Sequence, residues 1–134
     1  MEAVTGIGGI FLRSRDPETL ARWYAQHLGL PVAPGDATAE LPWQGPGSTI
    51  WAAFPHDTEY FGHAERECML NFRVADLDAM LLQLRAAGVR VEPDIEESSY
   101  GRFGWTVDPE GRRIELWQPP AVTDALGEPG NPLA

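Results

Sequence analysis

The chain of 134 residues has the size of one compact domain, and its 43% hydrophobic and 22% charged residues are ordinary values for a globular protein. A net charge of −10, with only ten Lys and Arg residues, argues against nucleic acid as a partner, because phosphate binding needs clustered positive charge. No apolar run approaches the ~20 residues that span a membrane, and the single cysteine, Cys68, excludes an internal disulfide and favours a reducing, cytoplasmic location.

The first predicted elements are a strand and a helix. Residues 7–14 carry apolar side chains in loose alternation, which predicts a strand. Asp16 is a suitable N-cap, Pro17 suits the first turn of a helix, and Gly29 can end it in a left-handed conformation. Between them one face is apolar, with Leu20, Trp23, Tyr24 and Leu28. Short extended segments are predicted to follow at residues 30–32, 38–41 and 48–54.

The second half repeats this order about sixty residues later, which indicates an internal repeat. Asp76 is the N-cap and Gly88 the stop of a second helix, whose apolar stripe is Leu77, Met80, Leu81 and Leu84. Extended segments are predicted at residues 90–92, 101–107 and 113–117, with a Pro-Gly hairpin turn at residues 108–111. Residues 56–67 link the halves, and residues 120–134 form a Pro- and Gly-rich tail.

The sequence resembles the vicinal oxygen chelate superfamily, which includes glyoxalase I, bleomycin-resistance proteins and extradiol dioxygenases. The resemblance rests on the repeat and on three segments: WYAQHLGL at residues 23–30, FRVADLDA at residues 72–79 and DPEGRRIELWQP at residues 108–119. It implies an α+β fold of one domain, residues 1–119. In that fold two βαβββ units, residues 6–55 and 68–118, form a concave mixed sheet with a central cleft and the helices outside. It also implies a homodimer, because family members often complete the cleft with a second subunit.

The resemblance also implies a divalent metal in the cleft, but the positions of its ligands fall on Gly9, Met69 and Glu115. Only Glu115 offers a suitable donor, and no His, Asp or Glu lies at residues 50–53, where a further ligand is expected. We therefore expect a degenerate metal site and no cofactor. His56 and His63 lie with acidic residues in the linker, where a solvated loop is the simpler expectation and a metal site stays the alternative.

Alternation along the strands selects the residues of a candidate ligand site. With Ile114 and Leu116 directed at the helices, Glu115 should face the cleft. The ligand-binding residues predicted beside it are Met69, Asn71, Arg73, Trp51, Trp105 and Trp117. Buried there, Glu115 needs water, a donor such as Arg73 or Tyr100, or a ligand cation, and a simple ion pair with Arg73 is the rival to a ligand role.

The predicted function is binding of a small organic ligand in a metal-free cleft. In a binding protein, the cleft would hold a cationic aromatic compound between tryptophans. In an enzyme, Glu115 is the candidate general base for lyase or isomerase chemistry. Two alternatives remain open: a metal-dependent glyoxalase- or dioxygenase-type enzyme with a rearranged site, and an accessory domain without a ligand.

Overall fold

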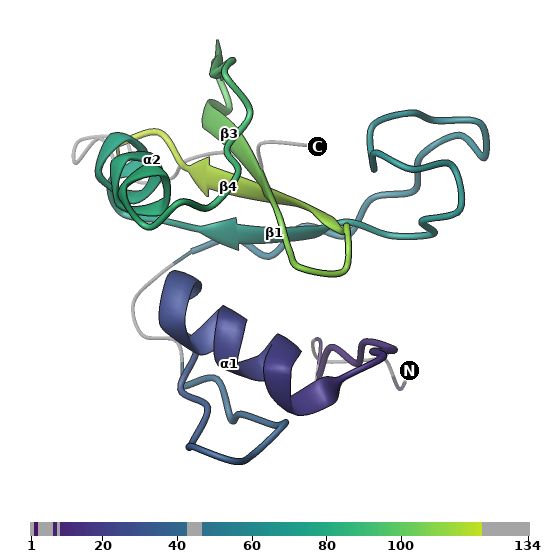
Figure 1. The fold of residues 1–134 in the computed structure, drawn as a ribbon. Helices are drawn as coiled ribbons and strands as arrows, with labels where there is room; N and C mark the ends of the chain where they lie inside the picture. The colour runs from purple at the N-terminus through teal and green to yellow at the C-terminus, as the bar shows by residue number, and fades with distance from the viewer. Residues whose placement is uncertain (1, 3–6, 8, 43–46, 122–134) are drawn as a thin grey trace.

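The computed structural model describes residues 2, 7, 9–42 and 47–121, which contain two helices and one four-stranded sheet (Figure 1). The helices are α1 (Pro17–Leu28) and α2 (Leu77–Ala86). The strands are β1 (Leu70–Arg73), β2 (Glu96–Ser98), β3 (Gly101–Val107) and β4 (Arg113–Gln118). They lie in the order β1-β4-β3-β2, with β1 parallel to β4 and the other pairs antiparallel. The predicted α+β class is confirmed, and the second half forms a complete βαβββ unit.

Both helices begin and end where the repeated signals predict. The Asp16 carboxylate accepts a hydrogen bond from the Thr19 amide, and Asp76 does the same for Ala79, at 3.2 and 3.0 Å. Gly29 and Gly88 both follow their helices with a φ of 76°, in the left-handed region that favours glycine. The repeat is therefore visible in the way that the two helices are capped.

The main core lies between the helices and one face of the sheet. Its buried members are Leu20, Tyr24, Leu77, Leu81, Leu84, Ile114 and Leu116. Helix α2 approaches β3 closely at Gly104, where a Cβ atom would lie 3.1 Å from a terminal carbon of Leu81. The absence of a side chain at this position lets the helix pack directly on the strand. Among the described residues, no helix is long and apolar enough to cross a bilayer.

The first half differs from the prediction, because within the described residues only α1 is regular there. The segments 9–14, 30–32, 38–41 and 48–54 form no ladder in the structure, although their composition favours strands. Leu12, Leu30 and Ile50 pack against the cores, but other apolar side chains of these segments stay uncovered, and Phe11 is 95% exposed and Trp51 82% exposed. A pattern of apolar residues records a preference for extended backbone, whereas a strand also needs a partner that pairs with its backbone.

The second half follows the prediction at its closing turn but differs from it at one edge of the sheet. The segment 90–92 contributes only an isolated bridge between Val91 and Thr106, and the edge strand forms instead at β2. The predicted turn at residues 108–111 is present, with the Gly111 amide donating to the Asp108 carbonyl oxygen at 3.0 Å and a φ of 86° at Gly111. Of the tail, residues 122–134 lie outside the described part of the chain.

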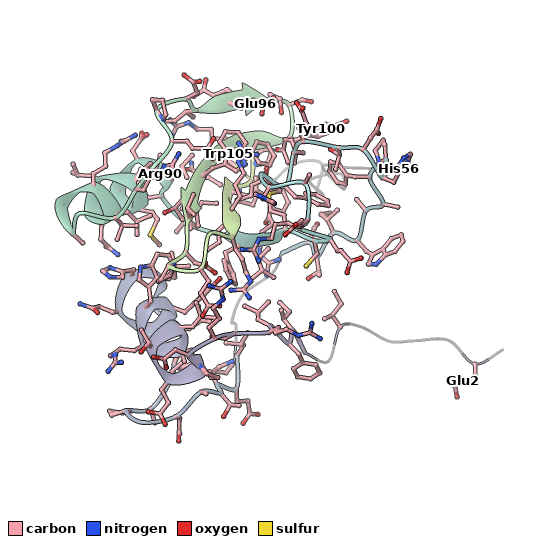
Figure 2. All side chains as sticks on the ribbon, turned by 45° about the vertical axis from the view of Figure 1, so that its right-hand side comes forward. Glu2, His56, Arg90, Glu96, Tyr100 and Trp105 are labelled. Atoms are coloured by element: carbon pink, nitrogen blue, oxygen red, sulfur yellow. The ribbon has the colours of Figure 1, made fainter. Side chains whose placement is uncertain are left out.

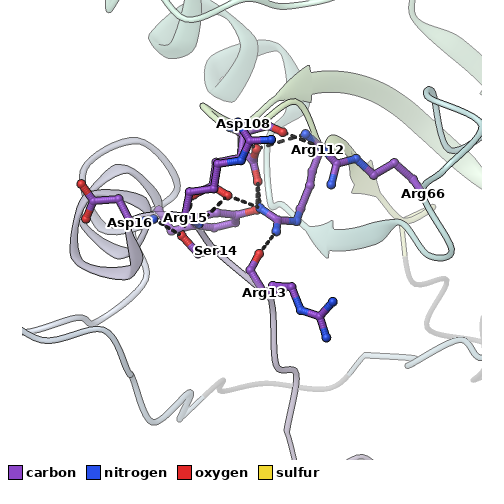
Figure 3. Close-up of polar contacts among 9 residues, drawn as sticks. Arg13, Ser14, Arg15, Asp16, Arg66, Asp108 and Arg112 are labelled. Atoms are coloured by element: carbon purple, nitrogen blue, oxygen red, sulfur yellow. Dashed lines mark hydrogen bonds and ion pairs between the residues drawn. The ribbon is translucent and has the colours of Figure 1, made fainter.

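Polar contacts attach the first half to this closing turn (Figure 3). The Tyr24 hydroxyl of α1 donates to the buried Asp108 carboxylate at 2.8 Å, and the same carboxylate is 3.2 Å from the Arg112 guanidinium. The Ser14 hydroxyl donates to the Glu110 carboxylate, and Arg112 donates to the carbonyl oxygen of Arg13. The turn therefore fixes the entry into α1 as well as closing the sheet.

Candidate functional site

The face of the sheet turned away from the helices is rich in aromatic side chains. Because side chains alternate along a strand, every second residue of β1, β3 and β4 lies on it. We call this surface the aromatic face and define it by Met69, Asn71, Phe103, Trp105, Glu115 and Trp117. Figure 2 shows Trp105 among the packed side chains at the centre of the molecule, with Glu96 and Tyr100 nearer its edge.

Two rows of paired residues organise the aromatic face. In one row Asn71, Glu115 and Trp105 lie side by side across β1, β4 and β3. In the next row Phe103 and Trp117 are paired, and their rings stack with centroids 6.1 Å apart and planes 5° apart. The Trp117 indole donates to the Tyr100 carbonyl oxygen at 2.8 Å, so the orientation of this ring is fixed.

Glu115 is the polar centre of this face and is only 5% exposed. Its carboxylate accepts hydrogen bonds from the Asn71 amide at 2.7 Å, from the Trp105 indole at 3.1 Å and from the Tyr60 hydroxyl. All three donors are neutral. Among the described residues, no Lys, Arg or His lies within ion-pair distance of it. The hydrogen bonds that this buried carboxylate accepts from the described residues thus come from neutral donors, two of them on aromatic side chains.

Tyr60 comes from the segment that joins the two halves and covers Glu115. Its ring stacks on Phe54, with centroids 5.5 Å apart, and meets Trp105 edge-on at 6.3 Å. Burial raises the pKa of the Tyr60 phenol well above its usual range, and the hydrogen bond to Glu115 raises this pKa further. The hydroxyl therefore stays protonated and remains a donor at any ordinary pH.

Arg113 supplies a fixed cation beside these rings. Its guanidinium donates to both carboxylate oxygens of Glu92, at 2.7 and 2.8 Å, and to the Tyr60 carbonyl oxygen at 2.7 Å. This ion pair holds the pKa of Glu92 below its usual value. The guanidinium carbon lies 4.6 Å from the centre of the Trp105 ring and 5.3 Å from that of Tyr60, in the range of cation–π contacts.

The comparison with known families decides the affiliation of the chain. Residues 9–117 match the family described as "Glyoxalase-like domain". The chain belongs to this glyoxalase-like family. The match confirms the predicted vicinal oxygen chelate superfamily. No curated protein matches the sequence significantly.

Solved structures share the fold of this chain. A glyoxylase/bleomycin resistance protein/dioxygenase domain from a Frankia species has a TM-score of 0.59 and 22% identity, covering 88% of this chain and 100% of its own. TnmS3, described as an antibiotic binding protein from a Streptomyces species, has a TM-score of 0.57 and 23% identity, covering 90% and 100%. The oxidase ChaP-H2 has a TM-score of 0.51 and 22% identity, covering 80% and 87%. At these identities the likeness shows the fold.

The structure brings most of the predicted site residues of this glyoxalase-like chain together. Met69, Asn71, Trp105, Glu115 and Trp117 all lie on the aromatic face. Trp51 does not, because its side chain is 82% exposed and it is absent from the residues packed on that face.

The predicted donors to Glu115 are wrong. Arg73 donates to the Ser48 carbonyl oxygen and makes no ion pair with Glu115. Tyr100 offers its carbonyl oxygen to Trp117, and its hydroxyl is not among the donors to Glu115. The partner of a long side chain depends on where distant backbone passes, and strand parity does not specify that.

Tyr60, Phe103 and Arg113 are the members of the site that sequence reasoning missed, and of these Tyr60 is the one that bonds to Glu115. It lies in the linker, where His56, His63 and their acidic neighbours drew attention and a solvated loop was expected. His56 and His63 are indeed exposed in the structure. The sequence does contain a signal for this residue. Phe54, Tyr60 and Phe61 carry large aromatic rings in and beside the predicted linker, and such rings are usually at least partly buried.

The family's metal does not fit the residues present. Gly9 offers no side chain, and the thioether of Met69 suits soft ions better than the divalent ions that His and carboxylates bind. In residues 2, 7, 9–42 and 47–121, no cluster of three or more His, Cys, Asp or Glu side chains could hold a metal ion. Glu115 alone is too few donors, since zinc takes four ligands and calcium or magnesium six or more.

Proposed function

We propose that this glyoxalase-like protein binds a small aromatic molecule on the aromatic face, with Glu115 as the polar anchor and without a divalent metal. The observation that carries the proposal is the environment of Glu115, a carboxylate 5% exposed whose donors among the described residues are the neutral groups of Asn71, Trp105 and Tyr60. Apolar rings with a few fixed polar groups are the usual composition of a small-molecule site.

The cost of burying Glu115 supports a role in binding. A carboxylate removed from water destabilises the fold unless strong partners compensate, and neutral donors compensate less than an arginine would. A residue at this position that served only packing would be apolar, as Ile114 and Leu116 are on the other face. The fold of an antibiotic binding protein, TnmS3, is similar, which supports a binding role for the same architecture here.

Catalysis with Glu115 as a general base is the second candidate, and the hydrogen bonds restrict it. One carboxylate oxygen accepts from Asn71, and the other accepts from both Trp105 and Tyr60. A substrate proton could reach the latter oxygen only after Tyr60 leaves, so direct approach is limited to the oxygen that accepts from Asn71 alone. Turnover of a bound compound that disappears in Glu115→Gln would establish the enzyme; binding without turnover supports the proposal.

The test is a screen of aromatic compounds by tryptophan fluorescence, followed by protein-observed NMR. A ligand should quench emission saturably at one site per chain and shift the indole N–H signals of Trp105 and Trp117. Trp117→Phe should reduce the quenching, whereas Trp23→Phe, which alters a ring on α1, should leave the affinity unchanged. A chemically diverse set of aromatic compounds that shifts neither indole signal would contradict the proposal and favour an accessory domain.

The proposal includes three properties with separate measurements. Elemental analysis should find no stoichiometric zinc, nickel, iron or manganese, and about one metal per chain would contradict a metal-free site. Light scattering should give a homodimer, in which a partner covers exposed apolar residues such as Phe11 and Trp51. Fractionation should find the protein in the cytoplasm, where the exposed thiol of Cys68 stays reduced.

A further inference from the structure

We infer that the ligand of this site carries a neutral phenolic hydroxyl, and that Tyr60 is a built-in phenol that the ligand displaces from Glu115. The inference rests on the proposed function and specifies the chemical class of its ligand. It differs from the cationic aromatic compound that the acidic sequence favoured.

The Tyr60 side chain makes every contact expected of a bound phenol. Its hydroxyl donates to the Glu115 carboxylate, one face of its ring stacks on Phe54, and its ring meets Trp105 edge-on. The Arg113 guanidinium carbon lies 5.3 Å from the ring centre. A carboxylate acceptor, two aromatic neighbours and a cation near the ring together select a hydroxylated aromatic ring.

The parts of the site differ in how firmly they are held. Asn71, Trp105 and Glu115 stand on paired strands, and Arg113 is fixed by its two hydrogen bonds to Glu92. Asn71, Trp105 and Glu115 keep their places when the Tyr60 side chain is absent, because the strands that carry them pair with one another. Arg113 also donates to the Tyr60 carbonyl oxygen, but its two hydrogen bonds to Glu92 hold the guanidinium without that contact.

The segment around Tyr60 is held by local turns. The Thr58 amide donates to the Pro55 carbonyl oxygen at 3.0 Å, and the Gly62 amide donates to that of Glu59 at 3.1 Å. In the described structure this segment joins no β-ladder. Among the described strand residues, Arg113 is the one whose side chain bonds to the backbone of this segment, at the Tyr60 carbonyl oxygen. Opening such turns requires little free energy, so Tyr60 can leave while the acceptor remains.

The local charges favour a neutral ring over a cationic one. Arg113 lies 4.6 Å from the centre of Trp105, so a ligand cation placed on that ring would meet a positive charge already there. A phenol avoids this repulsion, donates one hydrogen bond to Glu115 and still offers its ring to the guanidinium.

The experiment replaces the tethered phenol with a free one. Tyr60→Ala removes the ring and hydroxyl but keeps Cβ, so that phenol itself restores the missing atoms. Phenol, benzene and benzylammonium are titrated against the unsubstituted protein and the variant, by thermal shift and by the Trp105 indole signal in NMR. Phenol should bind the variant about tenfold more tightly than the unsubstituted protein, where it competes with the tethered ring. Benzene, lacking the donor, should bind the variant about tenfold more weakly than phenol.

Tyr100→Ala is the matched control, because it deletes the same side chain from a position that is 41% exposed. It should not gain affinity for phenol. If Tyr60→Ala fails to fold, Phe54→Ala takes its place, since it loosens the ring of Tyr60 and leaves the acceptor intact; phenol should again bind more tightly than to the unsubstituted protein.

Two results would overturn the inference without touching the proposed function. Benzylammonium binding the variant more tightly than phenol would assign a cationic ligand, and equal binding of phenol and benzene would show that the hydroxyl is not recognised. Neither result affects a ligand that the aromatic screen finds on this face. Conversely, the aromatic screen could find no ligand while phenol still binds Tyr60→Ala more tightly than the unsubstituted protein. That result would show that Tyr60 fills a packing site and not a ligand site, which contradicts both the proposed function and this inference.

Discussion

Two carboxylates are buried in the described part of the chain, each bonded to a tyrosine hydroxyl, and the contrast between them separates structure from function. Asp108 is 4% exposed and accepts from Tyr24; Glu115 is 5% exposed and accepts from Tyr60. Asp108 also pairs with Arg112 and accepts the amides of Glu110 and Arg112 within its own turn. Its charge is balanced and its partners are fixed by the backbone.

Glu115 has no such local support. Its donors come from β1, from β3 and from the linker, and all are neutral. The two carboxylates are equally buried, so burial alone does not identify a functional carboxylate. What distinguishes Glu115 is that no described residue forms an ion pair with it and that one donor sits on a segment held by local turns.

The largest effect is expected from Asp108→Ala. The substitution removes the acceptor of two backbone amides and leaves Arg112 without its buried partner, so the free energy of unfolding should fall by about 3–5 kcal/mol. Chemical denaturation measures it. Asp78→Ala is the control, because the Asp78 carboxylate is 69% exposed in its ion pair with Arg102 and its loss should change stability far less than the loss of Asp108. Equal losses in the two variants would contradict a structural role for Asp108.

A smaller difference is expected between the two tyrosines. Tyr24→Phe removes a buried donor from Asp108 and should lower the free energy of unfolding by about 1–3 kcal/mol. Tyr60→Phe should lower it by less than about 1 kcal/mol, since Tyr60 is only half-buried and water can replace its hydroxyl at Glu115. Denaturant titrations of both variants test the order. A larger loss for Tyr60→Phe would make the linker a structural element.

The signals that sequence reasoning captured are local. Asp16 and Asp76 bond amides three residues away, and Gly29 and Gly88 end the helices by their own backbone conformation. Alternation along β4 likewise placed Glu115 opposite the helix-packed Ile114, because parity needs only the strand itself.

What the sequence did not predict depends on distant chain. Tyr60 reaches Glu115 across 55 residues, and Arg73 binds a backbone oxygen at Ser48, 25 residues away. The missing ladders of the first half have the same cause, since pairing depends on a partner strand that a single segment does not encode. The fold class and the face of the sheet on which Glu115 lies could therefore be predicted, whereas the contacts that complete the site could not.

Alkaline pH should weaken the fold through both tyrosines. The pKa of the Tyr24 phenol is raised by burial and by Asp108, and that of Tyr60 by burial and by Glu115. An unfolded chain releases these protons near pH 10, whereas the folded chain retains them to higher pH. The unfolded state then binds fewer protons, so the free energy of unfolding is constant below about pH 10 and falls as the pH rises above it.

Denaturation between pH 9 and 11 measures this fall. Tyr24→Phe and Tyr60→Phe should each flatten the slope, and Tyr100→Phe, an exposed residue, serves as the control and should leave it unchanged. A slope that survives the removal of both buried hydroxyls would assign the alkaline transition to other groups.

The smallest effect on stability and the sharpest on function are expected from Glu115→Gln. Glutamine keeps the volume of the side chain, its oxygen can accept from Asn71 or Trp105, and no ion pair is broken, so the free energy of unfolding should change by no more than about 1 kcal/mol. Asp108→Asn, the same chemical change at the other carboxylate, should cost more, because Arg112 loses the charge that balances it.

Ligand binding should respond in the opposite order: a phenol bound by Tyr60→Ala should be held about tenfold more weakly once Glu115→Gln is added, since a charged acceptor is exchanged for a neutral one. Asp108→Asn in the same background should leave the affinity for phenol unchanged in whatever fraction remains folded. A loss of stability in Glu115→Gln that equals the loss in Asp108→Asn, with phenol affinity retained, would make the two carboxylates equivalent and remove the reason for placing the ligand at Glu115.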